Sequence, residues 1–196
     1  MKQLPIAAAL RLALVLALGT ASLAARADEY CDWGWGWLTR ACGGAVSAFK
    51  EGPWDLYLTG YAYHGRGTYT QEKIDSYQEN AWGGGLGRRH IDDRDNEHLV
   101  YAMGFQDSNY KPQYQFGYGW LARWALAENF RVGVGITAFV GFRSDYCNYM
   151  CPLPLILPLG AIEYRRVAFM ATYVPKAPGQ EGNGDVLFLF AKVALE

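Results

Sequence analysis

The chain has 196 residues, a formal net charge of −1 at pH 7, 51% hydrophobic residues and 15% aromatic residues. This length suits one domain, and a near-neutral charge without a basic stripe argues against nucleic-acid binding. The first residues read as a secretory signal: Lys2 and Arg11 are basic, residues 12–18 are apolar, and residues 25–27 form a small-x-small cleavage site. We therefore expect a signal peptide at residues 1–27, since this apolar stretch is far shorter than the ~20 residues of a spanning helix.

Residues 28–53 are rich in tryptophan and would form an N-terminal helix and a linker. Trp33 and Trp37 are one helical turn apart, which predicts a short amphipathic helix lying at a membrane interface. A helix packed on a soluble core is the alternative interpretation.

Four cysteines follow the signal, and in an exported protein they favour disulfides over a metal site. Cys147 and Cys151 are close enough in one loop to form a bridge. Cys31 and Cys42 would be roughly 16 Å apart on one continuous helix, well beyond bridging distance. Either the segment is broken at one of its glycines, Gly34, Gly36 or 43–44, or these two do not pair with each other. No metal and no other cofactor is expected.

Eight later segments alternate bulky and small residues with a period of two, which predicts strands. In the segment around residues 101–124, one run places Leu99, Tyr101, Met103 and Phe105 on a single face. The next run places Tyr114, Phe116, Tyr118, Trp120 and Trp124 on one face, with Gln115, Gly117, Gly119 and Arg123 opposite. Membrane barrels direct aromatic side chains to lipid and small or polar ones inward. We therefore expect an all-β fold, an eight-stranded antiparallel transmembrane β-barrel, with these bulky faces outside. The predicted strands are 55–63, 81–89, 98–106, 114–126, 129–143, 155–164, 166–174 and 185–195.

The connections differ in length. Residues 127–128 and 165–166 form tight turns, whereas the links from Tyr63 to Ala81, from Arg89 to His98 and from Arg143 to Leu155 are long. Long loops on one rim and short turns on the other are typical of outer-membrane barrels.

Two prolines mark expected gaps in the barrel wall. Pro158 falls within the sixth run and Pro175 just after the seventh, and proline cannot donate to a strand ladder. Because unpaired backbone is costly in hydrocarbon, a tolerated gap suggests a lateral doorway for lipid. A strand end without a further role is the alternative.

Most of the mature chain carries a series of short motifs in a fixed order: DLY at 55–57, His64, EKIDSY at 72–77, WGGGLG at 82–87, YAMGFQDS at 101–108, GYGW at 117–120, ENF at 128–130, PLPLILPL at 152–159 and TYVP at 172–175. On these motifs the chain resembles the lipid A palmitoyltransferase family of Gram-negative outer membranes. The resemblance covers the chain from about Trp54 to Leu195.

The resemblance implies an outer-membrane β-barrel at residues 54–196 that transfers a palmitoyl chain from a phospholipid to lipid A. It also implies a monomer among outer-membrane lipids, without nucleic acid. The family's catalytic residues fall on His64, Asp107 and Ser108, and its acyl-pocket floor falls on Gly119. The prolines beside the lateral lipid access fall on Pro158 and Pro175. Two further prolines of the family, beside a second wall gap, are replaced by Thr59 and Ala81, so the resemblance does not extend to that route.

Acyl transfer needs a base for the accepting hydroxyl, a group that holds the oxyanion and a dry pocket. His64 has a suitable ordinary pKa. Adjacent strand residues point to opposite faces, so Asp107 and Ser108 must lie where a strand breaks. Our hypothesis makes His64 the general base, oriented by Asp107, with Ser108 polarising the carbonyl instead of acting as a nucleophile.

Two other kinds of protein fit parts of the pattern. A non-catalytic small outer-membrane barrel, structural or lipid-binding, would explain the alternation but not the prolines beside an inward glycine. A secreted soluble sandwich that binds a lipid is the second alternative, although it would bury its aromatic faces.

Overall fold

The computed structural model describes residue 31 and residues 34–143, 151–176 and 184–195. The predicted signal peptide at 1–27 lies outside these residues, as do Trp33 and Cys147. No helix within these ranges is long and apolar enough to cross a membrane.

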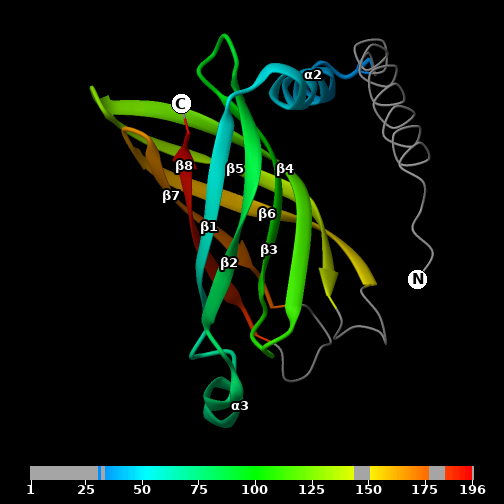
Figure 1. Ribbon diagram of the computed structural model, residues 1–196, viewed down its shortest axis with the longest axis vertical. Coiled ribbons are helices and arrows are strands. Elements are labelled where there is room, and N and C mark those ends of the chain that lie inside the picture. Colours follow the sequence, from blue (N-terminus) through cyan, green and yellow to red (C-terminus); the bar gives the residue numbers. More distant parts are fainter. Residues whose placement is uncertain (1–30, 32–33, 144–150, 177–183, 196) are drawn as a thin grey trace, which may run out of the picture.

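Eight strands form one closed barrel in which each strand pairs antiparallel with the next and β8 pairs with β1 (Figure 1). This confirms the predicted eight-stranded antiparallel barrel preceded by a short helix. The helices are α2 (Gly36–Glu51) and α3 (Gln71–Ser76). The strands are β1 (Trp54–His64), β2 (Asn80–Ile91), β3 (Glu97–Gln106), β4 (Pro112–Ala127), β5 (Phe130–Arg143), β6 (Cys151–Tyr164), β7 (Val167–Val174) and β8 (Val186–Ala194).

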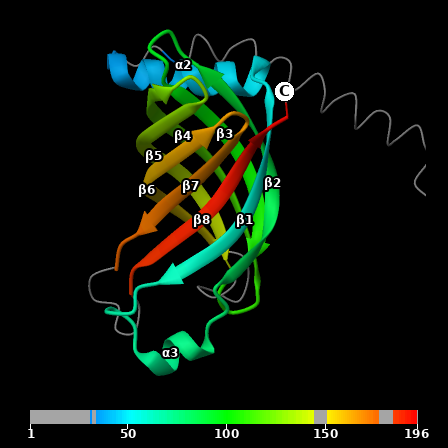
Figure 2. The ribbon, with the colours of Figure 1, turned by 90° about the vertical axis from the view of Figure 1, so that its left-hand side faces the viewer.

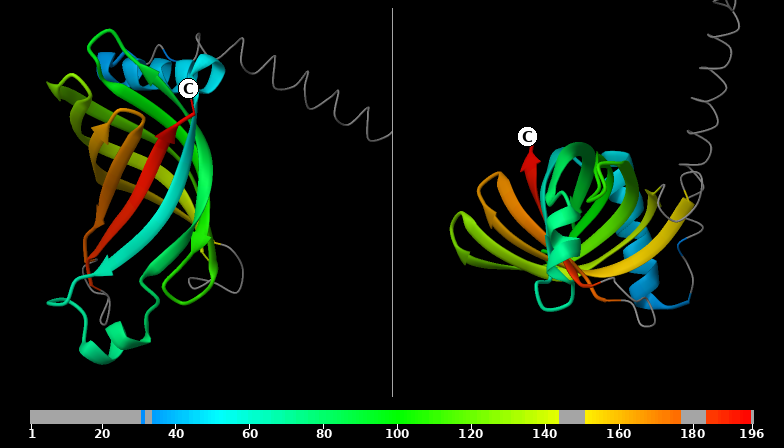
Figure 3. Two further views of the ribbon diagram at one scale, coloured as in Figure 1. Left: turned by 60° about the vertical axis from the view of Figure 1, so that its left-hand side comes forward. Right: turned by 90° about the horizontal axis from the view of Figure 1, so that it is seen from below.

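The two helices lie at opposite ends of the barrel (Figure 2). The last described residues lie at the α2 end, as the left view of Figure 3 shows. One predicted long loop proves to be short, because β2 continues to Ile91 and β3 begins at Glu97. The remaining link of residues 92–96 belongs to the rim of tight turns. It is closed by Asp92, whose carboxylate accepts hydrogen bonds from the backbone N–H groups of Arg94 and Asn96.

The chain breaks before α2, which settles the pairing of the first two cysteines. Cys31 and Cys42 form a disulfide with their Cα atoms 5.5 Å apart. Cys31 precedes the helix, and Gly34 has a φ of 73°, a conformation that glycine adopts without strain. The first of our two alternatives, a break at Gly34, is therefore correct. Cys151 is also disulfide-bonded, although the predicted bridge to Cys147 cannot be followed because Cys147 lies outside the described residues.

Helix α2 packs on β2 and β3 and leaves large apolar side chains exposed. The Arg88 guanidinium of β2 donates a hydrogen bond of 2.6 Å to the Gly52 carbonyl, just after the helix C-terminus. Trp35, Trp37 and Phe49 are all at least 60% exposed. An amphipathic helix of this kind buries its apolar face in the headgroup region of a membrane.

The bulky faces of β3 and β4 point in opposite directions. On β4, Tyr114 and Phe116 are exposed on the outside as predicted, and Gly119 is buried inside. On β3 the prediction is wrong, because Leu99 and Met103 are buried in the interior.

The strand register explains why β3 is bulky inside. Tyr101 pairs with Gly87 on β2 and with Gly117 on β4, and Leu99 pairs with Gly119. Glycines on both neighbouring strands leave the interior space that the β3 side chains fill. Period-two alternation separates the two faces of a strand, but it does not say which of them is inside.

The interior changes character along the barrel axis. Charged side chains fill the α2 end, and an apolar cluster fills the middle. The charged residues, which we call the inner charge cluster, are Asp55, Arg89, Glu97 and Lys192. The apolar cluster consists of Tyr57, Leu99, Met103, Leu121, Leu159, Ala168 and Met170. Within the described ranges this part of the interior is a packed core, and the cavity lies at the α3 end.

Candidate active site

His64 and Ser108 meet at the α3 end of the barrel. His64 is the last residue of β1 and is only 3% exposed. Strand β3 ends at Gln106, so Ser108 lies in the turn that follows, as expected for adjacent polar residues of this kind. The Nε2 atom of His64 and the Oγ atom of Ser108 are 3.1 Å apart.

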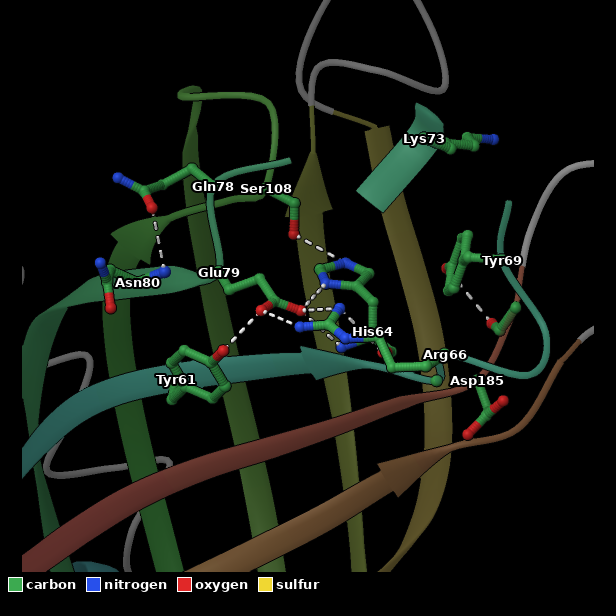
Figure 4. Close-up of polar contacts among 12 residues, drawn as sticks. Tyr61, His64, Arg66, Tyr69, Lys73, Gln78, Glu79, Asn80, Ser108 and Asp185 are labelled. Atoms are coloured by element: carbon green, nitrogen blue, oxygen red, sulfur yellow. Dashed lines mark hydrogen bonds and ion pairs between the residues drawn. The ribbon is translucent and has the colours of Figure 1, made fainter. Parts of the chain in front are cut away.

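The other imidazole nitrogen contacts Glu79, a residue that the sequence reasoning missed. The Nδ1 atom of His64 lies 3.2 Å from Oε1 of Glu79, which immediately precedes β2. Figure 4 shows Ser108 and Glu79 each joined by a dashed line to the imidazole ring, at its two different nitrogens. Glu79 thus has the place that we expected for Asp107. In the sequence, Glu79 is visible only as a carboxylate just before the WGGGLG strand. The number of residues between Glu79 and His64 gives no sign that the two side chains meet.

The Glu79 carboxylate is held by several donors. Arg66 donates two hydrogen bonds, of 2.8 and 2.7 Å, one to each carboxylate oxygen. The Tyr61 hydroxyl donates to Oε2 at 2.5 Å, and the backbone N–H of His64 donates to Oε1 at 3.0 Å. The Arg66 hydrogen bonds are the main cause that lowers the pKa of Glu79 to about 2. Glu79 is therefore a fixed negative charge beside His64 throughout the physiological pH range.

Asp107 shapes the turn that carries Ser108. Its Oδ1 atom accepts hydrogen bonds from the backbone N–H groups of Asn109 and Lys111, at 2.9 and 2.8 Å. Its Oδ2 atom is buried and lies 3.9 Å from Nη2 of Arg143. Among the described residues, no hydrogen bond joins Asp107 to His64. The structure thus places all three predicted residues at one rim, but only His64 and Ser108 in contact.

Two tyrosines from the loop between β1 and β2 cover His64. The ring centroids of Tyr69 and Tyr77 lie 5.2 and 4.6 Å from that of the imidazole. The backbone N–H of Gln78 donates to the Ser108 carbonyl at 3.0 Å, which ties this loop to the turn after β3. These contacts keep water from most of the imidazole ring and fix its distance to Ser108.

A cavity of about 760 Å³ leads from His64 and Ser108 into the barrel. Its volume falls in the range usual for ligand pockets. The deeper wall is apolar, formed by Phe139, Leu153, Leu155, Leu157, Phe188 and Phe190. A hydrocarbon chain along this wall would contact carbon atoms, whereas Gln115, Thr137 and Thr172 add polar groups elsewhere in the lining.

The cavity ends before it reaches Gly119. Gln115 is the deepest β4 residue that lines it, and Gly119 lies two inward positions further along the strand. A Cβ atom at Gly119 would lie 3.3 Å from Cδ2 of Leu159 and 3.4 Å from Cδ1 of Leu99, both in the apolar cluster. Gly119 faces inward, as expected, but packed side chains separate it from the cavity.

Tyr101 forms the inner end of the cavity instead. Its hydroxyl group lies 2.6 Å from Oγ1 of Thr137, and both residues line the space. The Thr137 hydroxyl donates its proton to the Tyr118 carbonyl at 3.1 Å, so Tyr101 is the donor to Thr137. The ring extends over Gly117, where a Cβ atom would overlap the Tyr101 hydroxyl.

The barrel wall is open beside the cavity. Pairing between β6 and β7 covers only Leu159–Thr172 to Tyr164–Val167, so along β6 it begins immediately after Pro158. Pro175 follows the last residue of β7 on the other side of this gap and lines the cavity. The prediction that both prolines mark gaps in strand pairing is correct.

The wall between β1 and β2 is closed at the place where the resemblance to the family would put a second gap. The Thr59 hydroxyl donates a hydrogen bond of 2.5 Å to the Ala81 carbonyl, which bridges β1 and β2.

Comparison with known proteins identifies one matching family. Residues 46–192 match the family model described as "Antimicrobial peptide resistance and lipid A acylation protein PagP". Three similar proteins are each named lipid A acyltransferase PagP. The one from Legionella pneumophila serogroup 1 (strain 2300/99 Alcoy) is 36% identical over 94% of this chain and 96% of its own length. The one from Laribacter hongkongensis is 42% identical over 78% and 72%, and the one from Bordetella pertussis (strain Tohama I) is 42% identical over 83% and 87%.

Proposed function

We propose that this chain, which belongs to the PagP family of antimicrobial peptide resistance and lipid A acylation proteins, transfers a palmitoyl chain from a phospholipid to lipid A. The observation that carries the proposal is the His64–Ser108 pair at the mouth of an apolar, chain-sized cavity. The protein would act as a monomer in the outer membrane of a Gram-negative cell, where both lipids are available.

The phospholipid would enter sideways from the membrane. The gap between Pro158 and Pro175 opens to the cavity, since Leu155, Leu157 and Val174 beside it are lining residues. An acyl chain passing between β6 and β7 would stay in an apolar environment throughout, and its ester group would come to rest at the rim near Ser108.

The chemistry is a transfer between two oxygens. Nε2 of His64 would accept the proton of a lipid A hydroxyl as that oxygen attacks the ester carbonyl, and Ser108 would hydrogen-bond the developing oxyanion. Collapse of the tetrahedral intermediate breaks the bond to the phospholipid glycerol oxygen, which takes the proton back from His64. The products are acylated lipid A and a lysophospholipid, so no cofactor is consumed. Asp107 would contribute by holding the Ser108 turn.

The direct test is to incubate the folded barrel with dipalmitoyl phosphatidylethanolamine and lipid A in mixed micelles and to analyse both lipids by mass spectrometry. We expect lipid A to gain one palmitoyl group and an equal amount of lysophospholipid to appear. His64→Ala should lower the rate by about 10²–10⁴-fold. His90→Ala, a substitution on β2 near the α2 end, serves as the matched control. If the wild-type protein leaves lipid A unmodified, the proposed transfer is contradicted and the chain is better explained as a non-catalytic barrel.

Ser108→Ala distinguishes the two roles open to a serine that contacts the base. A variant that keeps a large fraction of the wild-type rate excludes Ser108 as an obligatory nucleophile and agrees with a hydrogen-bonding role. Complete loss, together with an acylated serine in the wild-type protein during turnover, would contradict the role proposed here.

A further inference from the structure

We infer that Glu79 is the positioning residue for His64: it selects the tautomer and the orientation in which Nε2 is free to accept a proton. This inference rests on the proposed acyl transfer. It concerns a residue of the loop between β1 and β2 that was not among the site residues expected from the sequence.

The hydrogen-bond pattern around the imidazole carries the inference. An ionised carboxylate can only accept, so a contact of 3.2 Å between Oε1 of Glu79 and Nδ1 of His64 requires a proton on Nδ1. The lone pair of the neutral ring is then on Nε2, which faces Ser108 at 3.1 Å. A second contact, from the His64 backbone N–H to the same oxygen at 3.0 Å, keeps the carboxylate in line with the ring.

Glu79 is itself held rigidly, as a positioning group must be. Arg66 binds both of its oxygens, and Tyr61 adds a third side-chain donor. The Glu79 carbonyl also accepts a hydrogen bond of 2.8 Å from the backbone N–H of Ala62, two residues before His64 on β1. The carboxylate and the imidazole are therefore anchored to the same segment of strand, and their separation does not depend on the rest of the loop.

The remaining charged and titratable groups near His64 come from the β1–β2 loop with α3, the turn after β3, the end of β5 and the segment before β8. Tyr69 packs edge-on and Tyr77 at a tilt against the ring, and Lys73 of α3 lies 6.0 Å from the centroid of each tyrosine. Arg66 lies behind Glu79. Asp107 and Arg143 line the cavity together with Ser108, and Asp185 accepts a hydrogen bond from the Thr68 hydroxyl. Glu79 is the one carboxylate among these groups whose hydrogen bond to the imidazole is described.

The test is the pH dependence of the transfer rate in mixed micelles. Because Glu79 has a pKa of about 2, it stays ionised across the accessible pH range, and the acid limb of the profile reports protonation of His64. A carboxylate favours the imidazolium form. Glu79→Gln should therefore move the acid limb to lower pH and should reduce kcat by roughly 10²–10⁴-fold, since the ring loses its tautomer control.

Two further variants separate positioning from a general effect on folding. Glu79→Asp keeps the charge, so it should hold the acid limb near its wild-type position while recovering part of the rate. Arg66→Met removes a positive charge but keeps the carboxylate on His64, so it should move the acid limb to higher pH. This opposite shift keeps the test decisive even if Glu79→Gln does not fold. Glu72→Gln, an exposed carboxylate on α3, is the matched control.

The inference is overturned if Glu79→Gln keeps the wild-type rate, or if its rate falls while the acid limb stays in place in both Glu79→Gln and Arg66→Met. Failure of the proposed function is recognised differently, because the wild-type protein itself would then leave lipid A unmodified.

Discussion

At the scale of single residues, Tyr101 and Thr137 close the inner end of the cavity and so limit the length of acyl chain that it can hold. Tyr101 extends across the barrel interior, and its hydrogen bond to Thr137 prevents the ring from turning away. Behind it, Leu99 and Leu159 occupy the space beside Gly119. The glycine that we expected at the pocket floor therefore lies behind these side chains, and its role as the floor stays a prediction.

We predict that Tyr101→Ala shifts the donor preference toward longer acyl chains. Each buried methylene is worth about 0.8 kcal/mol, so the rate ratio between donors that differ by two carbons should rise by a few-fold to tenfold. Competition assays with phospholipids of defined chain length would measure it. Tyr114→Ala removes an outward ring from β4 and is the matched control. An unchanged preference in Tyr101→Ala, together with a shift in Gly119→Ala, would restore Gly119 as the floor.

At the scale of secondary-structure elements, β6 and β7 are paired over only part of their length. Eight residues of β6, from Cys151 to Pro158, pair with β5 but extend beyond the last β6–β7 pair, Leu159–Thr172. Pro158 cannot donate to β7, and Pro175 ends that strand, so the backbone itself keeps the wall open. The Thr59–Ala81 hydrogen bond has the opposite effect on the β1–β2 wall.

Restoring both backbone donors should narrow this gap. We expect Pro158→Ala combined with Pro175→Ala to lower the transfer rate several-fold, since additional ladder hydrogen bonds would hinder lateral entry. The assay compares initial rates in lipid vesicles, where the donor must arrive from the bilayer. Pro112→Ala, at the start of β4, is the control. A double variant as fast as the wild-type protein would show that lipid enters elsewhere.

At the scale of the whole molecule, the inner charge cluster fastens the closing strand to the rest of the barrel. Lys192 of β8 pairs with Glu97 of β3 across the interior and lies 4.0 Å from Oδ2 of Asp55 on β1. Asp55 pairs also with Arg89 of β2. The Lys192 and Glu97 side chains are 4% and 2% exposed, so neither charge can be hydrated if the other is removed.

Lys192→Met should therefore lower the free energy of unfolding by about 3–5 kcal/mol, the cost of leaving a buried charge unpaired. Replacing both partners, Lys192→Met with Glu97→Leu, should recover most of this loss. Urea unfolding in lipid vesicles would measure both values. Transfer activity of the folded variants should persist, because the cluster lies at the end of the barrel away from His64. Equal destabilisation by the single and double variants would contradict an ion-pair role.

Sequence by itself determined the strands and their number, because alternation is a local property that each segment carries whatever its neighbours are. It also indicated Pro158 and Pro175 as limits of pairing, since a missing N–H group acts in any context. The polar residues His64, Asp107 and Ser108 were found through motifs, which place residues at one rim without saying which of them touch.

Only the tertiary structure decided what depends on partners distant in the chain. Glu79 meets His64 because β1 and the start of β2 are adjacent, and the carboxylate has no periodic signature. Leu99 and Tyr101 point inward because glycines on β2 and β4 leave room for them, a fact of register between strands. The depth of the cavity follows from that packing. Contacts across the barrel, and not patterns within one strand, therefore set the chemistry and the length of the site.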